Sequence, residues 1–340
     1  MDEHHAINAD FSPFIPDGLT PFILGRTETL SLIPMKVGGV VFERFEYPSA
    51  FQGAMSARFA YLLNIGNGLA YHDGMGMPEW VLLDCGLLPG LFVGLCRKAK
   101  DLSSDIRQVL DQALVARALA RQPKRVHVEQ ILGIDDGALK DDELVPVSEF
   151  CAIPTLTGKE VVGYSLFSLE PRLGYLTKAL GLSVLQCLRY HWQIGVVQWD
   201  NPRALKTHLK FGELEILDPL TSIHSRAGDT IIYRLRIPDM AGLIEPLKVQ
   251  KSRQKDLDLR SNLRKITAVS EIREWRASSK AMEVLISLDR TDLWHFLHRS
   301  CENGAKIWLK GIVQDTSTFA HVSIQDKTSI DHQASTGNIS

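Results

Sequence analysis

The chain has 340 residues, of which 45% are apolar and 23% are charged, and its formal net charge is −2. At about 150 residues per domain, this length predicts about two domains with a sizeable core, and the composition excludes fibrous, disulfide-stapled and disordered classes. The nearly balanced charge argues against a protein dominated by a polyanionic partner. The five cysteines are widely spaced and form no CxxC pair, so we expect reduced thiols.

The N-terminal segment, residues 1–14, has no basic stretch followed by an apolar run, which predicts no signal peptide and a cytoplasmic location. Residues 13–63 carry short apolar runs separated by Pro and Gly, a pattern typical of strands joined by turns. The glycines of 64–78 predict a loop. A phosphate-binding loop is the alternative, but no lysine stands where that motif requires one. We therefore expect a β-rich extension over 1–79.

The middle of the chain alternates strand and helix patterns. Residues 80–96 predict one or two buried strands, and the apolar spacing of 102–120 predicts a helix capped by Ser103 or Ser104. Runs 144–153 and 160–169 flank a short turn with Gly158, which indicates a hairpin. A helix over 175–190 and a strand over 193–199 follow. Asn201 and Pro202 then start a helix over 203–210 that Gly212 closes, before strands over 214–217 and 230–237.

Beyond residue 238 the composition changes. Residues 248–276 hold nine basic and four acidic side chains, which predicts a basic helical linker, with a solvated face as the alternative. Nucleic-acid binding by this stretch together with Lys306 and Lys310 is poorly supported because Trp275 is the only aromatic residue of the stretch. A strand over 282–288, a helix over 292–301, a strand over 306–313 and a frayed tail complete the pattern.

Two segments carry a family resemblance. SLFSLEPRLG (165–174) and NPRALKTHLKFG (201–212) resemble a strand with its pyrophosphate turn and the Asn-x-x-Ala-x-x-x-Tyr-x-Lys-x-Gly segment of the GNAT superfamily of N-acyltransferases. The resemblance implies an α+β fold with a mixed central sheet flanked by helices. Its core would cover 80–238, with the β-rich extension 1–79 before it. A basic linker and a small α/β unit over 239–340 would follow.

The resemblance also implies acyl transfer from acetyl-CoA or another acyl-CoA to an amine. The residues expected to bind this co-substrate are Leu166, Phe167, Leu169, Arg172, Leu173, Gly174, Tyr175, Lys178 and Asn201. Independently of the family, a turn at a helix N-terminus is an anion site, and Arg172 adds a phosphate-binding cation. His208 replaces the family's tyrosine as proton donor to the thiolate, and Glu149 is the general-base candidate.

Each of these readings has an alternative. Glu149 could be a surface position on an alternating strand, His208 a packed or capping residue, and Lys178 a solvated helix residue. Cys151 reads as a buried thiol unless a histidine lies near it. His295 and His298 have helical metal-ligand spacing without a third ligand, so we expect no metal.

The expected partners are a small-molecule acyl donor and an amine acceptor. We expect neither nucleic acid nor a membrane as a partner, and the sequence leaves open whether the chain forms a homodimer. The alternative function is a catalytically inactive GNAT-like ligand-binding or interaction module.

Overall fold

The computed structural model describes residues 10–46, 54–71, 90–119, 137–198, 201–217, 230–248, 263–277, 282–314 and 317–325. The chain forms two compact units. Unit one comprises residues 1–191 and 239–247, and unit two comprises 192–238 and 248–340. Each unit combines a mixed β-sheet with helices, which confirms the expected α+β class. No helix among the described residues is long and apolar enough to cross a membrane.

The sheet of unit one has the strand order β7-β6-β5-β1-β4. Its strands are β1 (Thr20–Gly25), β4 (Glu43–Glu46), β5 (Leu91–Lys98), β6 (Leu144–Pro154) and β7 (Glu160–Ser168). Neighbours are antiparallel except β1 and β4, which are parallel. A separate two-stranded ribbon pairs β2 (Lys36–Val37) with β3 (Val40–Val41). Gly38 and Gly39 join these strands with positive φ, as a tight hairpin turn requires.

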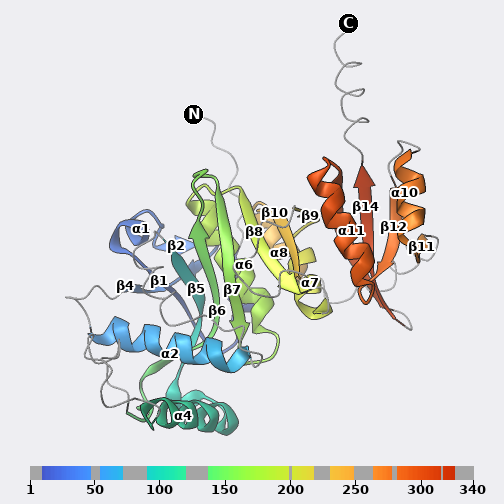
Figure 1. Ribbon diagram of the computed structural model, residues 1–340. Coiled ribbons are helices and arrows are strands. Elements are labelled where there is room, and N and C mark those ends of the chain that lie inside the picture. Colours follow the sequence, from blue (N-terminus) through green and yellow to red (C-terminus); the bar gives the residue numbers. More distant parts are fainter. Residues whose placement is uncertain are drawn as a thin grey trace, which may run out of the picture. The chain divides into compact units, whose positions relative to one another are not determined.

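Helices cover both faces of this sheet (Figure 1). The helices of unit one are α1 (Thr27–Ser31), α2 (Ala54–Ala70), α4 (Ser104–Leu119), α6 (Leu173–Cys187) and α8 (Met240–Lys248), with short 3₁₀ turns at Ser12–Phe14 and Ala99–Asp101. On β6 the side chain of Ser148 bonds Thr177 of α6. The next residue, Glu149, faces the side covered by α2, because successive side chains of a strand point to opposite faces.

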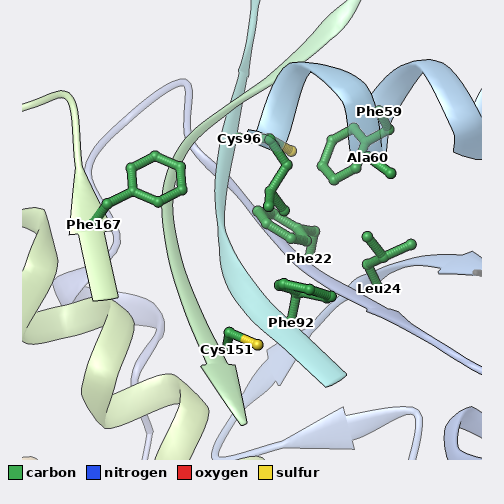
Figure 2. Packing of buried hydrophobic residues seen from close by; sticks show 9 residues of the cluster. Phe22, Leu24, Phe59, Ala60, Phe92, Cys96, Cys151 and Phe167 are labelled. Carbon is green, nitrogen blue, oxygen red and sulfur yellow. The ribbon is translucent and has the colours of Figure 1, made fainter. Parts of the chain in front are cut away.

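The core on the α2 side is an aromatic and aliphatic cluster (Figure 2). Phe59 of α2 meets Phe22 of β1 edge to face at 4.8 Å and stacks on Phe45 at 3.9 Å. Offset and edge-on ring contacts of this kind stabilise a core by about 1 kcal/mol beyond the buried area. Phe167 of β7 belongs to the same cluster, so α2 and β7 are packed together.

The sheet of unit two has the strand order β8-β10-β9-β13-β14-β12-β11. Its strands are β8 (Trp192–Gln198), β9 (Leu214–Ile216), β10 (Thr230–Arg236), β11 (Arg264–Ile266), β12 (Met282–Ser287), β13 (Lys306–Gln314) and β14 (Thr318–Gln325). Its helices are α7 (Pro202–Leu209), α10 (Val269–Ala277) and α11 (Thr291–Glu302). Only β11 and β12 pair in parallel among these strands.

Many predicted elements are confirmed. The hairpin appears as β6 and β7, with Gly158 at φ +69° in its turn, and the predicted helices and strands from 102 to 237 correspond to α4, α6, β8, α7, β9 and β10. The oxygen of the Asn201 side chain accepts the Ala204 N–H at 3.1 Å, so the predicted cap of α7 is correct. Strand 282–288, helix 292–301 and strand 306–313 correspond to β12, α11 and β13.

The prediction of strands and a loop for residues 54–70 is wrong, because this segment is the helix α2. The glycines near its end favour a loop. In the folded chain, however, a Cβ on Gly66 would lie 3.2 Å from the Phe167 ring, so the small residue allows close helix–sheet packing. Helix α1 also interrupts the expected strands.

The C-terminal region also differs from its prediction. Where the predicted basic linker is described, it contains the strand β11 as well as the helix α10. The strand β14 was not predicted. Residues 80–89, 249–262 and 326–340, together with His4 and His5, lie outside the described residues.

Candidate site at the β6–β7 hairpin

The candidate site is built on the pairing of β6 with β7. Glu149 lies opposite Phe167, and Cys151 lies opposite Ser165. Because side chains alternate along each strand, these four residues share one face of the sheet. That face is covered by α2, whose last turn contributes Asn67.

A short chain of hydrogen bonds ends on Glu149. The Asn67 side-chain N–H donates to the Ser165 hydroxyl at 2.6 Å, and that hydroxyl donates to Glu149 Oε2 at 3.3 Å. The other carboxylate oxygen, Oε1, is buried and has no hydrogen-bond partner among the described residues. A buried polar atom without a partner costs free energy, so this placement of Glu149 destabilises the fold. Such a cost is expected where a function requires the environment.

The protonation of Glu149 follows from its surroundings. The residue is fully buried, and burial raises the pKa of its carboxyl from 4.5 to about 8, although hydrogen bonds from Ser165 and Asn67 oppose this rise. The charged form is disfavoured because the carboxylate loses its hydration on burial. The surface alternative for Glu149 is therefore excluded. Its pKa lies close to neutral pH, where a general acid or base is most effective.

The side-chain hydroxyl of Tyr71 is hydrogen-bonded to the backbone of β7 at Leu166, the residue after Ser165. The Leu166 N–H donates to the Tyr71 hydroxyl at 3.3 Å, and the same hydroxyl donates to the Leu166 carbonyl at 2.9 Å. Tyr71 directly follows α2, and its N–H donates to the carbonyl of Asn67 in the last turn of that helix at 3.1 Å. The end of α2 thus holds Ser165 through Asn67 and Leu166 through Tyr71.

The predicted anion-binding turn connects β7 to α6. Arg172 is the N-cap residue of α6, with φ +70°, and its side chain is exposed. A left-handed conformation is unfavourable for a residue with a side chain, and such strain is found most often where function requires it. The turn is braced by Glu170, which forms a bidentate ion pair with Arg97 of β5 at 3.0 and 3.1 Å.

Gly174 has open space around its Cα. A Cβ added there would come no closer than 4.0 Å to another heavy atom, the Cβ of Ser168. Among the described residues, packing therefore does not require a glycine at this position. A missing side chain in an open turn at a helix N-terminus leaves room for a ligand to approach the backbone.

The other predicted donor-site residues of unit one differ in accessibility. Leu173 is buried, whereas Tyr175 is partly buried, and burial raises its pKa. Lys178 is fully buried within α6, and burial lowers its pKa well below the usual value. The alternative that Lys178 is a solvated helix residue is therefore excluded. Phe167 contributes its ring to the core cluster, and the Leu169 N–H donates to the Val147 carbonyl at 2.8 Å.

Two predicted site residues belong to unit two. His208 lies on α7 and is 8% exposed, with its ring 5.0 Å from that of Tyr233. Asn201 caps the same helix through its side-chain oxygen. Both residues thus have a packing or capping role within their unit, and their predicted roles toward a thioester stay predictions.

The remaining candidates from the sequence are the Cys151 thiol and the histidine pair of α11. Cys151 is fully buried and is a thiol that takes part in no disulfide, in agreement with its interpretation as a buried thiol. In the described part of the chain, no group of three or more His, Cys, Asp or Glu residues could hold a metal ion, and this includes His295 and His298 on α11.

Sequence reasoning missed Asn67, Ser165 and Tyr71 as members of the site. Ser165 stood within the segment that resembles a GNAT strand, and its place opposite Cys151 follows from the hairpin register. Asn67 and Tyr71 are spaced i, i+4, which places them on one face of a helix, but the helix itself was not predicted.

A scan of protein-family models matches none of them to this chain, and searches of curated proteins and of solved structures also return no match.

Proposed function

We propose that the chain is an N-acyltransferase of the GNAT type, which moves an acyl group from a thioester donor to an amine. The observation that carries the proposal is Glu149. It is a fully buried carboxyl group whose pKa is raised to about 8 by burial, with one oxygen that has no hydrogen-bond partner among the described residues. A buried acid of this kind costs stability, and catalytic sites are where such costs are found.

In this proposal Glu149 acts as the general base. Its carboxylate, once ionised, takes a proton from the neutral amine as the nitrogen forms a bond to the thioester carbonyl carbon. The carbon–sulfur bond then breaks, the sulfur leaves with the bonding electrons, and the protonated Glu149 returns the proton to it, so that the products are an amide and a thiol. The bond from Ser165 to Oε2 orients the carboxyl and leaves Oε1 for the proton. Because the pKa of Glu149 lies near 8, the base form accumulates as the pH rises through neutrality.

The turn before α6 supports binding of a phosphate-bearing donor such as acetyl-CoA or a longer acyl-CoA. Arg172 supplies an exposed guanidinium, and the first N–H groups of α6 supply the positive end of the helix dipole. The ion pair of Glu170 with Arg97 balances the nearest acidic charge of the turn. The open space at Gly174 lets phosphate oxygens approach the backbone.

Leu166 supplies the group that would receive the thioester. Its N–H and carbonyl bond a side-chain hydroxyl, that of Tyr71. An amide of a donor's pantetheine arm carries the same pair of functions, an acceptor and a donor. Rotation of the Tyr71 side chain would release both backbone groups, and an N–H aimed at a developing oxyanion contributes about 3 kcal/mol to the lowering of a barrier.

The same observation favours a second candidate. If the Tyr71 hydroxyl stays on Leu166, the strand offers no free backbone to a thioester, and the chain is a catalytically inactive GNAT-like ligand-binding or interaction module. The two candidates differ in whether thiol is released from a thioester in the presence of an amine.

The test is a thiol-release assay with the full-length protein, acetyl-CoA and a panel of primary amines. We expect amine-dependent release whose rate rises with pH to a plateau, with an apparent pKa of about 8. Glu149→Gln should lose at least a hundredfold in rate, because it keeps the shape of the side chain but cannot accept a proton. Ser165→Ala, which removes only the orienting bond, should lose less. Wild-type activity that Glu149→Gln retains would refute the role of Glu149.

A further inference from the structure

Unit two contains an open surface cavity, lined mostly by exposed side chains, that plays no part in the proposed acyl transfer. It has a volume of about 680 Å³ and is lined by residues of α10 and α11, two helices that contact each other. Its polar lining consists of Ser270 and Arg273 from α10 and of Asp292, His295, His298 and Arg299 from α11. Cavities of about 300–1,000 Å³ are the usual size for small-molecule sites.

The lining is dominated by hydrogen-bond donors and cations. Arg273 and Arg299 come from different helices, so their guanidinium groups can bind one ligand from two directions. Arg273 lies over the Phe296 ring at 5.5 Å, a cation–π contact that holds it against α11. The Nδ1 atom of His298 lies 3.3 Å from the Leu217 carbonyl and must carry the hydrogen, because a carbonyl only accepts.

The acidic groups nearby are already balanced. Asp292, the acidic member of the lining, forms a bidentate ion pair with Arg290 at 2.7 and 2.8 Å, and that pair lowers its pKa. Glu271 of α10 accepts hydrogen bonds from the Thr267 N–H and from Arg264. The two arginines of the cavity therefore give it a positive character.

The chemistry of this lining distinguishes between ligand classes. Within the described residues the two histidines and Asp292 do not form a metal-binding group. A carboxylate has one charge and two acceptor oxygens, whereas a phosphate monoester has a charge near −2 and three acceptor oxygens. The second matches two arginines and a hydroxyl more closely. The volume also exceeds what a bare phosphate ion needs, so there is room for the rest of a small molecule.

We propose that the cavity between α10 and α11 binds a small phosphomonoester, with Arg273 and Arg299 holding its phosphate group. This site is independent of the proposed acyl-transfer function, because all of its residues belong to unit two and none contributes to the Glu149 site.

The proposal is tested by NMR titration of the full-length protein with inorganic phosphate and with glucose 6-phosphate at constant ionic strength. The signals are the ring protons of His295 and His298, and glucose serves as the unphosphorylated control. We expect saturable shifts with both phosphate probes, tighter binding of the sugar phosphate, and no shift with glucose. Shifts that chloride reproduces at equal ionic strength, or that do not saturate, would overturn the proposal.

Variants locate the binding. Arg273→Ala and Arg299→Ala should each raise the Kd at least tenfold, and Arg273→Lys should bind with intermediate affinity because it keeps the charge and loses the planar fork. Arg236→Ala, at an exposed position of β10, is the matched control and should bind as the wild type does. If Arg273→Ala and Arg299→Ala both retain wild-type affinity while their circular dichroism is unchanged, the site is not at this cavity.

Discussion

Replacing Glu149 by Gln should stabilise the protein while it removes the proposed base. The raised pKa means that the folded chain keeps its proton at pH values where the unfolded chain has lost it. Stability therefore falls as the pH rises above 4.5 and stops falling near pH 8. Glutamine has the same shape and no charge to lose, so this part of the pH dependence disappears in the variant.

The size of the effect follows from the two pKa values. Each pH unit between 4.5 and 8 costs the wild type about 1.4 kcal/mol of unfolding free energy. The variant should thus match the wild type near pH 4.5, exceed it by about 3 kcal/mol at pH 7, and exceed it by about 5 kcal/mol above pH 8. Because every other titrating group is shared, the difference between the two proteins isolates Glu149.

The assay is urea unfolding of both proteins from pH 4.5 to 8.5, followed by circular dichroism. Ser165→Ala provides a comparison, since the loss of its bond to Oε2 should raise the pKa of Glu149 further, so that the fall in stability continues to a higher pH at the same slope. A difference between wild type and Glu149→Gln that stays constant across this range would refute the reasoning, because it would mean that Glu149 ionises with an ordinary pKa.

Three further variants test other parts of the account. Tyr71→Phe removes the hydroxyl that bridges the N–H and carbonyl of Leu166. It should therefore lower the unfolding free energy by about 1–3 kcal/mol and tighten acetyl-CoA binding. Unchanged binding would show that this backbone is not the donor site. Gly174→Ala should leave the Tm unchanged or higher, because the added methyl group meets only the ligand. The same variant should weaken acetyl-CoA binding at least fivefold, as measured by calorimetry. Equal affinity would contradict binding of acetyl-CoA against the backbone of this turn. Gly94→Ala should destabilise the protein by about 3 kcal/mol or more in urea unfolding, because its Cβ would lie 2.1 Å from a carbonyl oxygen of β6. Gly68→Ala is the control, since its Cβ would meet no described atom within 4 Å, and it should not destabilise the protein. Similar costs for both variants would argue against the close pairing of β5 with β6.

The parts of the fold that the sequence predicted are those with strong local signals. Helix α7 has an Asn cap, a proline at its first position and a glycine beyond its end, and its bounds follow from these residues alone. The β6–β7 hairpin has two β-rich runs around a turn that contains Gly158. Each of these signals acts within a few residues and does not depend on the rest of the molecule.

The parts of the fold that the sequence did not predict depend on contacts between residues that are distant in sequence. Gly66 disfavours a helix locally, but α2 forms because its face packs on β7, where Phe167 leaves no room for a larger side chain. Strand β14 is buried on both faces between β12 and β13, so it lacks the alternation of a half-exposed strand. Tertiary packing outweighs local preference in both segments.

The same reasoning explains which site residues were found. Glu149 was predicted as a base from its strand, and its burial, which gives it a pKa near 8, became evident only once α2 was seen to cover it. Tyr71 could not be connected to Leu166 from the sequence, since 95 positions separate them. The resemblance to an acyltransferase turn identified Arg172 and Gly174, whose left-handed backbone and open surroundings support an anion site.

The measurement that tests the central claim most directly is a calorimetric titration of the full-length protein with acetyl-CoA and with a long-chain acyl-CoA. The wild type should bind at least one of them saturably, Arg172→Ala should bind at least tenfold more weakly, and the control Arg236→Ala should bind normally. If neither thioester binds, or if Arg172→Ala binds both with wild-type affinity, then the turn before α6 is not a thioester-donor site and the acyltransferase proposal is wrong.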